Sequence, residues 1–93
     1  MANEETKTNP EEGELIGEVI HFFSNIGVAV VGLSGNLSVG DTIRIVGGEN
    51  TDFNQVVDSM EVERKKITAA KKGDEVGLKV NEKVREGYKV YKV

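Results

Sequence analysis

The residues of this 93-residue chain that could do chemistry are mostly bases near its C-terminal end. Residues 64–93 hold ten lysines and arginines against four carboxylates, whereas residues 15–63 hold one arginine against seven carboxylates. Lysine and arginine neutralise phosphate groups, and aromatic rings give unpaired bases a surface for stacking. On this basis we predict an RNA-contacting surface made of Arg64, Lys65, Lys66, Lys71, Lys72, Lys83, Arg85 and Tyr88.

The same bases also have a purely structural interpretation. Arg64–Lys66 and Lys71–Lys72 bracket one expected loop, and they would keep that loop in solvent. The net charge of −4 belongs to the N-terminal segment, because residues 1–14 carry five acids and one lysine while residues 15–93 carry eleven of each sign. Acids and bases could mix on folding, or the acidic segment could cover a basic face and compete with RNA. Both interpretations stay open.

No residue pattern typical of catalysis, metal binding or cofactor binding accompanies the bases. The chain has one histidine, His21, and no cysteine, whereas a zinc site needs three or four nitrogen, sulfur or carboxylate ligands. Gly35–Thr42 matches the phosphate-binding Gly-x-x-x-x-Gly-Lys-Thr loop except at Asp41, where a carboxylate would repel phosphate. We expect His21 to be a partly buried strand histidine, and we expect no nucleotide, cofactor, metal or enzyme activity.

Two Gly-Asp pairs predict the elements that position these residues. Gly40-Asp41 and Gly73-Asp74 each precede a run with alternating β-branched residues. Glycine accepts a positive φ and aspartate bonds nearby backbone amides, so each pair predicts a capped turn that leads into a strand. The pattern favours an all-β domain with six strands, at roughly 15–23, 28–34, 42–47, 54–63, 75–80 and 88–93. Within residues 49–72, however, the spacing of apolar side chains fits a helix as well as a strand.

The N-terminal residues predict a different kind of structure. Residues 1–13 are acidic and nearly free of apolar side chains, so we expect a disordered tail, followed by one domain over residues 14–93. There is no basic-then-apolar leader and no run of about 18 apolar residues that would cross a membrane. We therefore expect a cytoplasmic protein without a membrane partner.

Five segments together carry a family resemblance. They are Ile16–Val19, Gly27–Val31, Leu37–Ile43, Asp58–Val62 and Ala69–Leu78. In this order they resemble the second-domain β-barrel of elongation factor Tu-type translational GTPases, and more closely the stand-alone translation elongation factor-like proteins. The resemblance covers residues 15–93. It implies a closed six-stranded antiparallel Greek-key β-barrel, in which 54–63 is a strand and 64–72 a loop.

The resemblance also implies a function. Such a barrel without a GTPase domain would be a non-catalytic binding module that contacts RNA, either tRNA or the ribosome, or another translation-related partner. Barrels of this type also resemble accessory domains at the C-termini of some peptidase-like enzymes. The alternative is therefore a protein-interaction barrel that pairs with a separate catalytic subunit.

Overall fold

The computed structural model describes residues 13–93, and all of the regular secondary structure in this range is β-strand. The predicted all-β class is confirmed, and no helix in this part of the chain could cross a membrane. The predicted disordered tail falls almost wholly on residues 1–12, which lie outside the described residues. The strands are β2 (Glu14–Phe23), β3 (Val28–Leu33), β4 (Leu37–Ser38), β5 (Thr42–Gly47), β6 (Thr51–Val56), β7 (Met60–Val62), β8 (Lys65–Ile67), β9 (Ala69–Ala70), β10 (Glu75–Lys79) and β11 (Lys89–Lys92).

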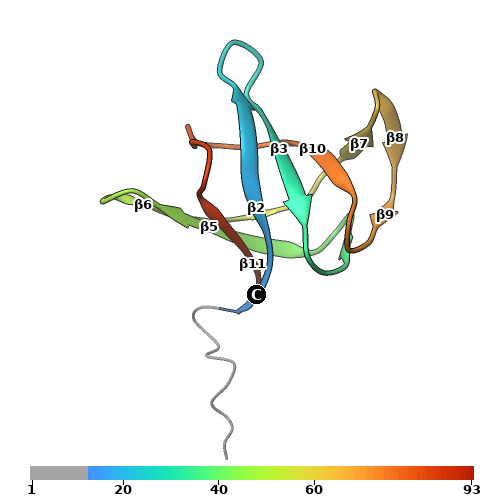
Figure 1. Cartoon of the computed structure of the whole chain (residues 1–93), viewed down its shortest axis with the longest axis horizontal. Helices are drawn as coiled ribbons and strands as arrows, with labels where there is room; N and C mark the ends of the chain where they lie inside the picture. Colours follow the sequence, from blue (N-terminus) through green and yellow to red (C-terminus); the bar gives the residue numbers. More distant parts are fainter. Residues whose placement is uncertain (1–12) are drawn as a thin grey trace, which may run out of the picture.

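The strands form one large curled sheet and one small sheet. The large sheet has the order β6-β5-β11-β2-β3-β10-β7-β8, and β4 pairs with β9 beside it (Figure 1). Every pairing is antiparallel. Because β6 and β8 are both edges, the order is open, and the predicted closed six-stranded barrel is not confirmed.

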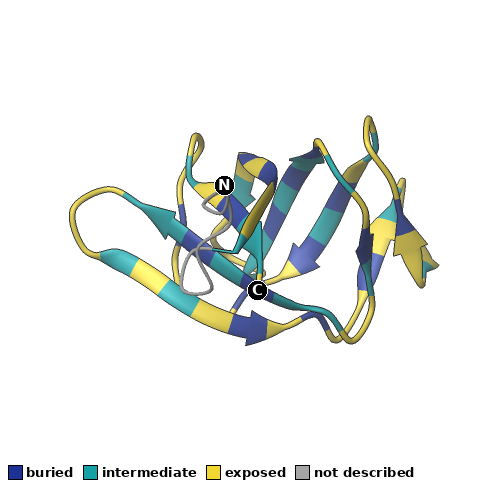
Figure 2. Ribbon diagram, turned by 90° about the horizontal axis from the view of Figure 1, so that it is seen from below, coloured by how far each residue is buried: buried dark blue, intermediate teal, exposed yellow. Residues whose placement is uncertain are grey.

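The core follows from alternation along the strands. In β3, β5 and β10 every second side chain is buried, which Figure 2 shows as alternating bands. A sheet with one wet face has this period of two because successive side chains point to opposite faces. Phe22 and Phe53 pack against the core, whereas Phe23 is 43% exposed. The large side chains that are fully buried are Ile16, Val19, Val31, Leu37, Ile43, Ile45, Met60, Val76, Leu78, Val84 and Val90.

The long strand β2 lets the sheet curl. Its register against β3 shifts between Val19 and His21. Its register against β11 shifts between Val90 and Tyr91 of β11. An extra residue in one strand of an antiparallel pair bends that strand and increases its twist. The two irregularities therefore allow β2 to pair with β11 and β3 while the sheet wraps around the core.

Both predicted Gly-Asp turns have the same geometry. The Asp41 Oδ2 atom accepts a hydrogen bond from the Ser38 N–H at 2.9 Å, and the Asp41 N–H donates to the Ser38 carbonyl at 3.0 Å. Asp74 makes the same two bonds with Lys71, at 3.1 and 3.0 Å. The glycine before each aspartate has a φ of +99° or +95°. The prediction that these aspartates cap turns is confirmed.

A buried side chain bridges the open seam of the sheet. Gln55 lies on the edge strand β6 and is 9% exposed. Its Nε2 atom donates to the Lys79 carbonyl, and its Oε1 atom accepts from the Asn81 N–H, both at 2.8 Å. These bonds join β6 to the end of β10 without a backbone ladder. The core can therefore be enclosed although the strand order is open.

The chain between residues 54 and 72 differs most from the prediction. The predicted strand 54–63 is broken between β6 and β7, and the predicted loop 64–72 contains β8 and β9. β7 and β8 form a hairpin whose two-residue turn is Glu63-Arg64, with φ values of +52° and +70°. Such turns usually carry Asn-Gly or Asp-Gly, so the usual sequence signal for a hairpin is absent here.

Candidate interaction surfaces

The predicted RNA-contacting residues lie at two separate places. Arg64–Lys66 belong to the β7–β8 hairpin and Lys71–Lys72 to the turn before β10, and all five are exposed. Lys83 and Arg85 lie in the connection from β10 to β11. Figure 1 shows that connection on the far side of β2 and β3 from β8. The structure therefore does not unite the eight residues in one surface, and RNA contact by them stays a prediction.

Tyr88, the aromatic member of that set, is part of the packing. It is half-buried against the core, and its ring lies on the backbone of Gly47 and Gly48. A Cβ atom on Gly47 would overlap the Tyr88 ring. The ring face on that side is therefore covered by β5 and the following turn, and a base could not stack on it.

Several bases pair with acids from the other half of the sequence. The Lys89 Nζ atom lies 3.4 Å from Glu18 Oε1, and the Lys92 Nζ atom lies 3.7 Å from Asp41 Oδ2. Both pairs join a base of residues 64–93 to an acid of residues 15–63. The two strongly charged halves of the sequence thus mix in part on folding, as the structural interpretation of the charges expects.

Arg44 and Asp52 form the best-aligned ion pair in the described part of the chain. The guanidinium donates through Nε to Oδ1 at 2.7 Å and through Nη2 to Oδ2 at 2.6 Å. These hydrogen bonds hold the pKa of the Asp52 carboxyl below its usual value. The pair ties β5 to β6.

His21 lies on a strand as expected, but it is more exposed than we expected. Its side chain is half-exposed, its Nδ1 atom lies 3.4 Å from Glu86 Oε2, and its ring meets the edge of Phe23 at 4.3 Å between centroids. The register shift after Val19 interrupts the alternation of buried and exposed positions, which leaves His21 on the wet side. Among residues 13–93, no group of three or more histidine and acidic side chains could hold a metal ion.

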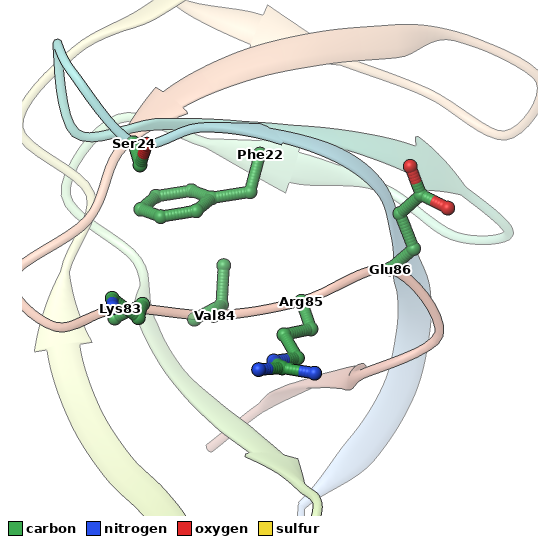
Figure 3. Close-up of a pocket in the computed structure, with 6 residues that line it drawn as sticks. All are labelled: Phe22, Ser24, Lys83, Val84, Arg85 and Glu86. Carbon is green, nitrogen blue, oxygen red and sulfur yellow. The ribbon is translucent and has the colours of Figure 1, made fainter.

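One pocket, of about 500 Å³, lies between β2 and the connection to β11. Figure 3 shows Phe22 and Val84 pointing toward each other, while Arg85 points away from them and Glu86 points to another side. Lys83 and Ser24 complete the lining. Since its charged groups do not converge, this pocket has no geometry suited to one anion.

A larger groove, of about 710 Å³, crosses the outer face of β3, β10 and β7. The register places Val30 opposite Gly77, and Gly77 opposite Glu61, so these three residues form a row across the groove. We call it the acidic groove. Its lining residues are Phe23, Ile26, Val28, Val30, Glu61, Val62, Glu63, Arg64, Gly73, Asp74, Glu75 and Gly77.

The acidic groove combines exposed apolar side chains with carboxylates. Phe23 and Ile26, from the end of β2 and the turn after it, are 43% and 56% exposed. The lining holds four carboxylates and one base, Arg64, and Lys66 lies opposite Glu61 at the edge of the groove. None of the four carboxylates is in an ion pair within residues 13–93. The sequence analysis missed this groove, although a glycine in the middle of a strand, such as Gly77, can signal a close approach.

Comparisons with known proteins point away from translation. No protein-family model matches the chain. It is 43% identical over 76 residues to an uncharacterised protease of Methanocaldococcus jannaschii, a match that covers 82% of this chain and 19% of that protein. It is 36% identical over 78 residues to a collagenase of Porphyromonas gingivalis, covering 83% of this chain and 22% of the collagenase. The chain thus spans about a fifth of the length of these relatives.

A solved structure matches the fold closely. It is the C-terminal domain of a protein described as a U32 peptidase from Geobacillus thermoleovorans, with a TM-score of 0.81 and 24% identity, and the match covers 86% of this chain and 92% of that domain. The chain has the fold of that C-terminal domain. The selenomethionine form of the same domain matches with a TM-score of 0.79, covering 84% of this chain and 98% of that domain.

Two expectations from the sequence are therefore wrong. The chain is not shown to be a translation elongation factor-like protein, because the relatives are a protease and a collagenase and the structural neighbour is a peptidase domain. The expectation of no enzyme activity is contradicted as well, because the relatives, of which this chain spans about a fifth, are named as a protease and a collagenase. The motifs behind the translation resemblance are turn and strand signals. They report backbone geometry, which proteins of different function can share.

Proposed function

We propose that residues 14–93 form an accessory domain that associates with a peptidase-like catalytic unit. One observation carries the proposal: the fold accounts for 92% of a separately solved C-terminal domain of a U32 peptidase. The 43% identity to a protease supports the proposal further. Because the match covers only 19% of that protease, most of the protease lies outside the region that resembles this chain.

Exposed apolar side chains on one hairpin are consistent with such an association. Ile20, Phe23 and Ile26 lie on β2 and in the turn after it, and they are 41%, 43% and 56% exposed. The central part of an interface is richer in apolar and aromatic side chains than the remaining surface. A surface of this kind fits a domain that is partly covered by another protein.

The test uses the M. jannaschii protease prepared without the region that matches this chain. We expect the full 93-residue chain to form a complex with it, measured by isothermal titration calorimetry and sedimentation velocity. The excised region of the protease serves as the positive control and as a competitor. If that region binds and this chain does not bind at about 100 μM, where even a weak complex with a Kd in the micromolar range would form, the proposal is wrong.

A further inference from the structure

We propose that the acidic groove binds an extended polypeptide segment of another chain, in which apolar side chains alternate with lysine or arginine. This inference goes beyond the proposed function, because it can be tested on this chain without any catalytic unit.

The floor of the groove allows a close approach by a second backbone. The φ of Gly77 lies outside the left-handed region, and a Cβ atom there would lie 3.5 Å from Val28 Cγ1 and 3.8 Å from the Glu61 carbonyl oxygen. These are ordinary contact distances, so neither backbone strain nor packing requires glycine. Glycine inside a strand is less stable than alanine. Its effect here is to leave the row between Val30 and Glu61 free of a side chain.

The apolar part of the groove suits alternate side chains of an extended segment. Phe23 and Ile26 border one side, Val28 and Val30 lie beside them, and Glu61 lies across Gly77 on the other side. In an extended segment every second side chain points the same way, at intervals of about 6.5–7 Å. The volume of about 710 Å³ lies within the range of protein sites that bury most of a small ligand.

The charge of the groove selects a basic segment. Glu61, Glu63 and Glu75 are in no ion pair within the described residues, and Asp74 uses one oxygen to cap its own turn. Arg64 is the only base in the lining, and Lys66 lies opposite Glu61 at the edge of the groove, so four carboxylates face two bases. Complementary charges across an interface favour association with one class of partner and disfavour the opposite charge. Lysine or arginine at the positions between the apolar side chains would face these carboxylates.

The test uses fluorescein-labelled peptides of about nine residues, long enough to cross three strands. The first peptide alternates valine and lysine, the second has glutamate in place of lysine, and the third has serine in place of valine. Binding to the full 93-residue chain is measured by fluorescence anisotropy, and the site is mapped from amide chemical shifts. We expect the first peptide to bind at least about tenfold more tightly than either of the others, with shifts centred on Val30, Gly77 and Glu61.

Two variants test whether the groove is the site. Gly77→Val places a side chain on the groove floor, and Glu63→Lys/Glu75→Lys reverses two exposed charges at its edge. Each should weaken binding of the valine–lysine peptide by about tenfold or more. The control Glu49→Lys, in the β5–β6 turn outside the groove, should bind the peptide as the unmodified chain does. The amide spectrum of each variant shows whether it is folded, and the charge variant does not alter the floor.

Three results would overturn the inference. In the first, the valine–lysine peptide fails to bind or its shifts lie elsewhere, including the pocket around Val84. In the second, the variants bind as the unmodified chain does. In the third, only the charge reversal weakens binding, which would mean unspecific attraction of a cation. None of these results affects the proposed association with a catalytic unit, whose test uses a different probe.

Discussion

At the scale of single residues, the turn between β7 and β8 is the most strained feature of the described chain. Glu63 and Arg64 are its non-glycine residues with positive φ. Each non-glycine residue in the left-handed region costs roughly 1–2 kcal/mol. Strained backbone often occurs where a surface binds another molecule, and these two residues line the acidic groove.

We predict that Glu63→Asn/Arg64→Gly stabilises the protein. Asn-Gly is the preferred pair for a two-residue hairpin turn with positive φ at both positions, so the free energy of unfolding should rise by about 1 kcal/mol. The melting temperature should rise by about 4–8 °C in a domain of this size. Urea and thermal unfolding followed by circular dichroism measure both quantities.

The control for this prediction is Arg64→Ala, which removes the long side chain but keeps the Cβ atom. It should give no comparable gain in stability. An Asn-Gly variant that is no more stable than the unmodified chain would mean that the turn is not strained as its φ values indicate.

At the scale of elements, the end of the β5–β6 hairpin is held by one aromatic ring. The Tyr88 ring lies against Gly47 and Gly48, and the connection before β11 carries that ring to the hairpin. The close approach requires residues without a side chain at the end of β5. The ring therefore adds a packing contact to the backbone pairing of β5 with β11.

We predict that Gly47→Ala destabilises the protein, because its methyl group would overlap the Tyr88 ring. Such overpacking costs about 1–3 kcal/mol. The matched control is Gly77→Ala, whose methyl group makes only ordinary contacts at 3.5 Å or more. Urea unfolding should show a clear loss for the first variant, and no loss or a small gain for the second, because alanine is favoured over glycine inside a strand. Equal effects of the two would contradict the packing described for Tyr88.

The sequence predicts the elements well where two local signals agree. The segments predicted at 15–23, 28–34, 42–47 and 75–80 correspond closely to β2, β3, β5 and β10, because clear alternation and glycine-marked turns coincide there. Between residues 54 and 72 the prediction is wrong, because a short break shifts the alternation after Val56 and the hairpin turn lacks Asn and Gly. The acidic groove could not be predicted, since it is formed by three strands whose register is not visible in local patterns.

At the scale of the whole molecule, an open sheet encloses the core, whereas the family resemblance implied a closed barrel. The seam depends on Gln55, whose amide joins β6 to Lys79 and Asn81. The sequence indicates only a polar residue within a segment whose pattern fits a helix as well as a strand. Its burial and its partners follow from how the sheet curls, which no local pattern specifies.

We predict that Gln55→Ala destabilises the protein by about 2–3 kcal/mol, because it removes two buried hydrogen bonds and leaves the Lys79 carbonyl and the Asn81 N–H without them. The neighbouring Asn54→Ala, at an exposed position of the same strand, should cost little. Urea unfolding measures both, and amide hydrogen exchange should show faster exchange at Asn81. A neutral effect of Gln55→Ala would mean that the seam does not need this bridge.

The pairing of β2 with β11 has a consequence for any protein that contains this domain. Glu14 pairs with Lys92, and Gly13 lies against the Lys92 carbonyl, so both ends of the described chain emerge at the same point (Figure 1). A neighbouring polypeptide joined to either end would be tethered there, and the domain could be inserted into a loop of a host protein with little distortion of the host. Rotation about that tether would leave the end of the domain farthest from it, where Figure 1 shows the turn between β2 and β3, facing outward.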